Sequence, residues 1–228
     1  GASRLAPRAG GARAVARHRV TCLGCGAKGL IGAPKPTREG VLRTKEHTAR
    51  NVARSKDLVR PFLDCEGDNA ATLVDNLDWT APMSAIDFLR DIGKHFTVPY
   101  MLAKDSVSAR LDGGLSYTEF SYMLLQAADF QHLYRTMGVE AQVGGADQWG
   151  NITAGLELIR KTLSGPLGEA AEAFALRYPL LLDPSGAKFG KTSVGTSVWL
   201  DPARTSPYAF YQFLVDRPDS EVGKLLRL

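Results

Sequence analysis

The stretch that decides the fold is residues 139–163, VEAQVGGADQWGNITAGLELIRKTL. Its first seven residues predict a strand, and residues 146–163 predict a helix that follows directly after two glycines. Residues 176–182, LRYPLLL, predict the next strand. A strand, a helix and a second strand in this order are typical of an α/β fold with a largely parallel sheet.

The same alternation extends toward both ends of the chain. Residues 71–76, ATLVDN, predict a buried strand, and residues 20–36, VTCLGCGAKGLIGAPKP, predict a short strand entering a glycine- and proline-rich loop. Residues 44–63 predict a helix. Three further helix starts carry capping signals: Ser84, Ser116 with Glu119, and Ser206 before Pro207. The helix that begins after Ser116 is expected to end at Gly138.

Composition limits the class of protein. The chain has 228 residues, 44% of them hydrophobic, a net charge of +4 and a pI of about 9.0. Residues 1–60 hold 14 of the 28 Lys and Arg residues and three acidic residues, which suits a polyanionic partner. No apolar run approaches the roughly 18 residues that span a bilayer, so we expect no membrane association and a cytoplasmic location.

The cysteines leave an alternative open. Cys22 and Cys25 form a CxxC pair, while Cys65 stands alone, so a second metal-binding pair is missing. The four histidines form no i,i+4 pair, and we predict no zinc or other metal site. A CxxC metal or redox protein nevertheless remains a third interpretation of the sequence.

Residues 143–151, VGGADQWGN, form the first candidate site, because ligands in α/β folds bind beyond the carboxyl ends of the strands. Gly144 and Gly145 let the backbone approach a ligand, and the Asp147 carboxylate suits the hydroxyls of a ribose. The competing interpretation is that Asp147 only caps its helix.

The second candidate site lies on the predicted helix after Ser116. Tyr122, Gln126 and Asp129 share one helical face and offer a hydroxyl, an amide and a carboxylate to a small zwitterion that carries a phenol. An ordinary solvated face is the alternative. A neighbouring apolar stripe consists of Met123, Ala127, Phe130, Tyr134 and Met137.

The third candidate site is residues 183–193, DPSGAKFGKTS. Gly186 is one residue too close to Gly190 for a P-loop, but Lys188, Lys191 and Thr192 suit a polyphosphate. A solvated turn is the alternative.

Together these stretches resemble tyrosyl-tRNA synthetase, a class I enzyme of bacterial type. GGADQWGNITAG is similar to its ribose-side signature, SYTEFSYMLLQAADF to its tyrosine-recognition helix, and KFGKT to its mobile phosphate loop. The resemblance implies a Rossmann-like parallel sheet with a helical insertion at about residues 84–135. It also implies the substrates tyrosine, ATP with Mg²⁺ and tRNA(Tyr), and a homodimer that forms through the insertion.

The resemblance also implies a role for each candidate residue. Tyr122 and Gln126 would hold the ammonium group of tyrosine, and Asp129 would accept the phenol hydroxyl. Tyrosyl-tRNA synthetase is itself the known example of such a contact rejecting phenylalanine by about 10⁴–10⁵-fold. The remaining roles are the tyrosine pocket for Gln142, the tyrosine carboxylate for Gln148, the ATP ribose for Gly145 and Asp147, and the pyrophosphate for Lys188, Lys191 and Thr192.

Several features depart from the family pattern. Nothing in the chain matches the His-Ile-Gly-His signature, Ala33 replaces an aspartate that binds the substrate ammonium, and Lys28 replaces a threonine. We therefore expect an N-terminally incomplete catalytic domain in residues 20–200, with little activity of its own. A basic arm at residues 1–19 would precede it, and residues 201–228 would lead toward an absent anticodon-binding part. The alternative is a non-catalytic module that binds tRNA or another partner.

Overall fold

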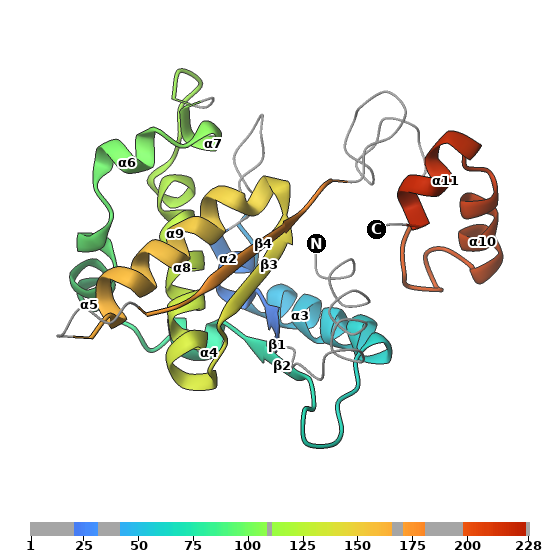
Figure 1. The fold of residues 1–228 in the computed structure, drawn as a ribbon, viewed down its shortest axis with the longest axis horizontal. Helices are drawn as coiled ribbons and strands as arrows, with labels where there is room; N and C mark the ends of the chain where they lie inside the picture. Colours follow the sequence, from blue (N-terminus) through green and yellow to red (C-terminus); the bar gives the residue numbers. More distant parts are fainter. Residues whose placement is uncertain (1–20, 32–41, 109–110, 166–170, 181–197, 227–228) are drawn as a thin grey trace. The chain divides into compact units, whose positions relative to one another are not determined.

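The computed structural model describes residues 21–31, 42–108, 111–165, 171–180 and 198–226. The chain divides into two compact units, Gly1–Pro179 and Leu180–Leu228 (Figure 1). The three predicted phosphate-binding residues, Lys188, Lys191 and Thr192, lie outside the described residues, as does Ala33.

The first unit is built on parallel strand pairs. Strand β1 (Thr21–Gly24) pairs with β2 (Thr72–Asp75) from Thr21 opposite Thr72 to Gly24 opposite Asp75. Strand β3 (Ala141–Gly145) pairs with β4 (Phe174–Tyr178) in the same parallel sense. Parallel pairs joined by helical crossovers confirm the predicted α/β class, and within the described ranges the strands form two separate pairs.

Helices connect and cover these strands. Between β1 and β2 lie α2 (Gly26–Ile31), α3 (Lys45–Val59) and the short helix η1 (Arg60–Phe62). After β2 come α4 (Leu77–Thr80), α5 (Ala85–Asp91), η2 (Gly93–His95), α6 (Val98–Leu102) and α7 (Asp105–Ser108).

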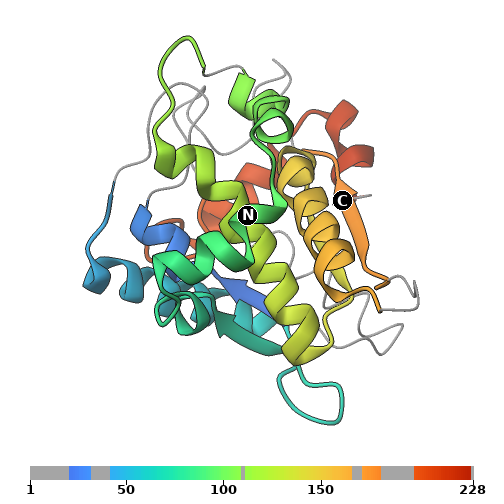
Figure 2. The ribbon, with the colours of Figure 1, turned by 90° about the vertical axis from the view of Figure 1, so that its left-hand side faces the viewer.

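The centre of the first unit is the packing of α8 (Tyr117–Met137) against α9 (Trp149–Leu163), which lie side by side in both views (Figures 1 and 2). Gly155 allows the close approach, because a Cβ there would lie 2.9 Å from Cδ1 of the buried Phe130. The core around this contact contains Ile92, Phe96, Met101, Met123, Leu124, Ala127, Ala154 and Leu158.

The helix ends follow the predicted capping signals. The Ser84 hydroxyl accepts a hydrogen bond from the Asp87 N–H at 3.1 Å, and the Ser116 hydroxyl accepts one from the Glu119 N–H at 3.3 Å. Gly138 ends α8 in the left-handed conformation with a φ of 65°. In the second unit, Ser206 caps α10 (Pro207–Val215), and α11 (Asp219–Leu226) follows.

The predicted boundaries need correction at three places. Residues 26–31 form helix α2 where the sequence predicted a loop, because side chains distant in the sequence bind the N–H groups at the start of this helix. Helix α9 begins at Trp149, after the short helix η3 (Ala146–Gln148), so the chain is still turning at Asp147. Strand β4 begins at Phe174, two residues before the predicted start.

Candidate functional site

The candidate site centres on Asp129, which lies in the middle of α8 and is 1% exposed. Gln126, one turn earlier on the same face, is also buried, and Tyr122 is half-buried. This face is therefore not an ordinary solvated surface. A buried carboxylate requires partners, since desolvation strongly disfavours an unpaired charge.

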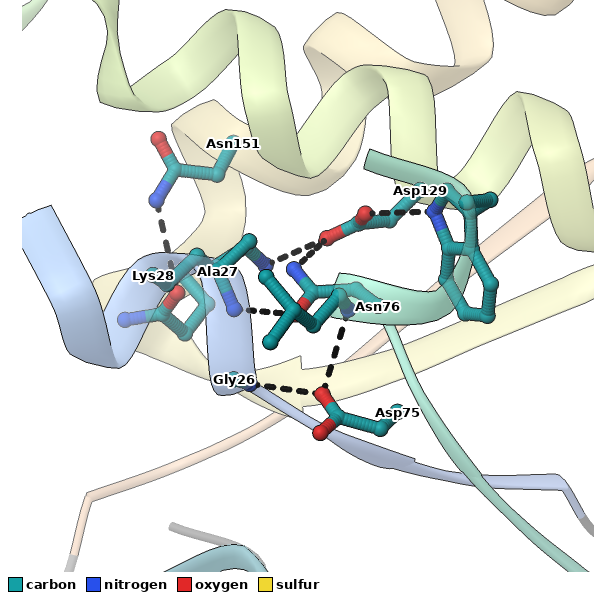
Figure 3. Close-up of polar contacts among 10 residues, drawn as sticks. Gly26, Ala27, Lys28, Asp75, Asn76, Asp129 and Asn151 are labelled. Carbon is teal, nitrogen blue, oxygen red and sulfur yellow. Dashed lines mark hydrogen bonds and ion pairs between the residues drawn. The ribbon is translucent and has the colours of Figure 1, made fainter. Parts of the chain in front are cut away.

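Three donors from other elements supply those partners (Figure 3). The Lys28 ammonium of α2 lies 2.9 Å from Asp129 Oδ2. Asn76 Nδ2, at the end of β2, donates to the same oxygen at 3.1 Å, and Trp79 Nε1, in α4, donates to Oδ1 at 3.1 Å. The carboxylate is thus held in one orientation by three elements that meet α8.

The end of β2 also organises the start of α2. Asp75 Oδ1 accepts a hydrogen bond from the Gly26 N–H at 2.8 Å, and Asn76 Oδ1 accepts one from the Ala27 N–H at 2.9 Å. A Cβ at residue 26 would lie 2.5 Å from Asp75 Oδ1, so this contact requires glycine. Asn76 therefore bridges α2 and Asp129, because its amide oxygen binds the helix while its amide nitrogen binds the carboxylate.

The buried charges shift the pKa values of their neighbours. Burial alone would lower the pKa of Lys28, but the attraction of Asp129, with smaller effects of Cys25 and Tyr122, outweighs it and raises the pKa above its ordinary value. Lys28 is thus protonated at neutral pH. Burial also raises the pKa of Tyr122, although the nearby Lys28 ammonium opposes that rise. The Lys28 nitrogen lies 5.8 Å from the centre of the Tyr122 ring.

The second predicted group lies where β3 meets α9. Gly144 and Gly145 end β3, and a Cβ at Gly144 would lie 2.8 Å from Ile152 Cδ1. Asp147 is exposed beside them, and Gln148, not Asp147, is the N-cap residue of α9. Gln148 Oε1 accepts a hydrogen bond from Asn151 Nδ2 at 3.3 Å. The side-chain oxygen of Gln142 is buried and has no hydrogen-bond partner among the described residues.

The structure therefore gathers the predicted tyrosine-side residues Tyr122, Gln126 and Asp129 on α8. It positions Gln142 within β3, Gly145 at the carboxyl end of that strand, and Asp147 and Gln148 in the turn that follows. The two groups belong to neighbouring elements, because α9 packs against both α8 and the β3–β4 pair.

Sequence reasoning did not include Lys28, Asn76 and Trp79 among the site residues. For Asn76 a signal existed: Asp75 and Asn76 stand at the carboxyl end of a predicted strand, where parallel-sheet folds place ligand-binding side chains. For Lys28 the sequence showed only a departure from the family pattern, and its buried ion pair depends on tertiary structure.

The described residues contain no cluster of three or more His, Cys, Asp or Glu side chains that would suit a metal ion. Within the same ranges no helix has the length and apolar character needed to cross a membrane. Cys25 and Cys65 carry free thiols.

Comparisons with known proteins identify the class to which this arrangement belongs. The chain is a member of the class I tRNA synthetase family whose model is described as "tRNA synthetases class I (W and Y)" and matches residues 12–228. Its curated relatives include a tyrosine–tRNA ligase of Leifsonia xyli, 54% identical over 216 residues, which cover 94% of this chain and 47% of the relative. The tyrosine–tRNA ligase of Geobacillus stearothermophilus is 52% identical over 214 residues, covering 93% of this chain and 50% of that protein.

Solved structures agree with this assignment. A C-terminally truncated mitochondrial tyrosyl-tRNA synthetase of Aspergillus nidulans is similar with a TM-score of 0.72 and 28% identity, over 90% of this chain and 60% of that chain. The corresponding Coccidioides posadasii structure gives a TM-score of 0.71 and 26% identity, over 90% of this chain and 59% of that chain. The resemblance to tyrosyl-tRNA synthetase is confirmed, and the chain spans about half the length of the curated relatives it matches.

Proposed function

We propose that this chain carries the tyrosine-recognition and ribose-binding parts of a tyrosine–tRNA ligase, which activates tyrosine with ATP and transfers it to tRNA(Tyr). The observation that carries the proposal is the buried Asp129 carboxylate, fixed by Asn76 and Trp79 on the helical face that also bears Tyr122 and Gln126. The names and identities of the curated relatives support the same activity.

On the tyrosine side, Asp129 would accept a hydrogen bond from the phenol hydroxyl, and Tyr122 and Gln126 would hold the ammonium group. A buried carboxylate distinguishes tyrosine from phenylalanine because phenylalanine brings no donor to a group that is costly to leave unpaired. Gln142 would line the same pocket, where its partnerless amide oxygen offers an acceptor to the ligand.

On the nucleotide side, Gly145 and Asp147 would bind the ribose, and Gln148 would bind the carboxylate region of tyrosine. That carboxylate attacks the α-phosphate of ATP, a reaction that depends on positioning and on stabilisation of the charge that develops. Mg²⁺ would arrive with ATP as part of the substrate. The binding of pyrophosphate by Lys188, Lys191 and Thr192 stays a prediction from the sequence.

A homodimer formed through the insertion is also part of the proposal. Large apolar side chains of α5 and α6 are exposed there: Ile86 is 71% exposed and Val98 is 58% exposed. Exposed apolar side chains in one region favour a protein–protein interface. Introducing a charge with Ile86→Asp should shift the sedimentation of the chain toward the monomer, and an unchanged sedimentation coefficient would remove this part of the proposal. Cytoplasmic location stays a prediction.

The proposed activity is tested by calorimetric titration with a non-hydrolysable tyrosyl-adenylate analogue, with adenosine as the reference ligand. The analogue should bind more tightly than adenosine, and Asp147→Ala should weaken it because the ribose hydroxyls lose their acceptor. Asp57→Ala, which removes an exposed carboxylate on α3, is the matched control and should bind as the wild type does. An analogue that binds no better than adenosine, or equally well to Asp147→Ala, would reject the proposal.

A further inference from the structure

The feature that goes beyond the proposed activity is Lys28. Its side chain is 5% exposed, although lysine is among the residues that are almost never fully buried unless paired. Within the described residues it forms an ion pair with Asp129, the carboxylate to which the proposed function assigns the tyrosine hydroxyl.

The position of the Lys28 ammonium matters as much as its charge. Tyr122 and Asp129 are seven residues apart on α8, which separates them by about 10 Å along the helix. The Lys28 nitrogen is 2.9 Å from Asp129 Oδ2 and 5.8 Å from the centre of the Tyr122 ring. It therefore lies near both ends of the face on which a tyrosine ligand would extend from its ammonium group to its phenol.

The hydrogen-bonding capacity of Asp129 is also largely used. A carboxylate has about four acceptor positions, and Lys28, Asn76 and Trp79 occupy three of them. The Asn76 side chain also accepts a hydrogen bond from the Ala27 N–H at 2.9 Å, and the Trp79 ring stacks on His132 at 4.5 Å, whereas the Lys28 ammonium ends a flexible four-carbon chain. Of these three donors, Lys28 is therefore the one that a ligand can displace without breaking either of those further contacts.

We propose that Lys28 is an internal occupant of the phenol site, which competes with the tyrosine hydroxyl for Asp129 and so weakens tyrosine binding by this chain. The inference rests on the proposed function, because it takes Asp129 as the phenol acceptor. Lys28 is here a specificity-determining residue, since a ligand must break its buried ion pair before it can reach the carboxylate. Separating the two partners of a buried ion pair is strongly unfavourable. Because a tyrosine ligand must meet this cost, it should bind about 10²–10³-fold more weakly than it would without Lys28.

The test is the dissociation constant for tyrosine, with phenylalanine as the second ligand, measured by calorimetry on the wild type, Lys28→Thr and the control Lys45→Thr. Lys45 is exposed at the start of α3, so the control makes the same chemical change away from Asp129. Lys28→Thr should bind tyrosine about 10²–10³-fold more tightly than the wild type and should prefer it more strongly over phenylalanine. Lys45→Thr should match the wild type.

A second variant protects the test against misfolding, which circular dichroism would reveal in Lys28→Thr. The double variant Lys28→Ala/Asp129→Asn leaves no buried charge unpaired. It should bind tyrosine more tightly than the wild type, but with less preference over phenylalanine than Lys28→Thr, because a neutral amide is a weaker acceptor.

The outcomes separate the two proposals. If the wild type prefers tyrosine over phenylalanine and binds it as tightly as the folded Lys28 variants do, the internal-occupant inference is wrong and the proposed function stands. If neither the wild type nor a folded Lys28 variant prefers tyrosine, Asp129 is not a phenol acceptor. The proposed function then fails, and the inference fails with it.

Discussion

The buried pair of Lys28 and Asp129 gives a quantitative prediction about stability. Asp129→Asn keeps the size of the side chain but leaves the Lys28 ammonium buried without its counter-charge. Breaking a buried ion pair in this way costs about 3–5 kcal/mol, a large part of the 5–15 kcal/mol typical of a folded domain. We expect Asp129→Asn to lower the free energy of unfolding by that amount.

Replacing Lys28 instead of Asp129 should lower the free energy of unfolding by a smaller amount. Lys28→Met keeps the length of the side chain, and the buried negative charge of Asp129, now without its ion-pair partner, still receives hydrogen bonds from Asn76 and Trp79 at 3.1 Å each. Hydrogen bonds to a charged group contribute about 1.5–3 kcal/mol, so these two offset part of the loss. The double variant Lys28→Met/Asp129→Asn removes both charges and should be more stable than Asp129→Asn alone.

Urea denaturation of the wild type, the two single variants and the double variant gives the coupling energy between the two side chains. We expect a coupling of at least about 2 kcal/mol. Single-variant losses that add to the double-variant loss within about 0.5 kcal/mol would refute the reasoning, because they would mean that the two side chains act independently.

The stability difference between the wild type and these variants should depend on pH. The pKa of Lys28 is raised in the folded chain, so its stabilising contribution is fully present below the ordinary lysine pKa of about 10.4 and is lost as the pH rises through the folded value. The stability difference between the wild type and Lys28→Met should therefore shrink in strongly alkaline solution. A difference that stays constant into that range would contradict the assigned ion pair.

Three further outcomes are expected. Gly26→Ala should lower the free energy of unfolding by about 1–3 kcal/mol in urea denaturation, because its Cβ would lie 2.5 Å from Asp75 Oδ1. Gly223→Ala in α11 is the control and should not lower it, because a Cβ there would meet open space. Ser116→Ala should reduce the free energy of unfolding by about 1 kcal/mol and so lower the thermal midpoint, because α8 loses its N-cap. Ser116→Asp should keep the cap and the midpoint. Burial lowers the pKa of His132, which stacks on Trp79 at 4.5 Å, so stability should fall as the pH drops below about 6.5, where the unfolded chain binds the proton more readily. His132→Phe should keep the stack and reduce that fall between pH 7.5 and pH 5, and an unchanged fall would exclude His132 as its source.

The sequence predicted those features that local chemistry determines. The helix ends at Ser84, Ser116 and Gly138 could be predicted because each cap depends on backbone groups within a few residues of it. The spacing of Tyr122, Gln126 and Asp129 predicted a shared face for the same reason.

Features that depend on distant residues were not predictable in this way. Helix α2 forms where a loop was expected because Asp75 and Asn76, each 49 residues away from the N–H that it binds, accept hydrogen bonds from its start. The pairing of Lys28 with Asp129 joins elements about 100 residues apart in the chain. No local pattern at Lys28 distinguishes a buried ion pair from a solvated lysine.

We assign the recognition of a phenol in this chain to Asp129. It is tested most directly by the relative affinity of Lys28→Thr for a tyrosyl-adenylate analogue and its phenylalanyl counterpart, with and without Asp129→Asn. We expect a strong preference for the tyrosyl analogue in Lys28→Thr and the loss of most of that preference when Asp129 is also replaced. Equal affinity for the two analogues in a folded Lys28→Thr chain, or a preference that survives Asp129→Asn, would contradict it.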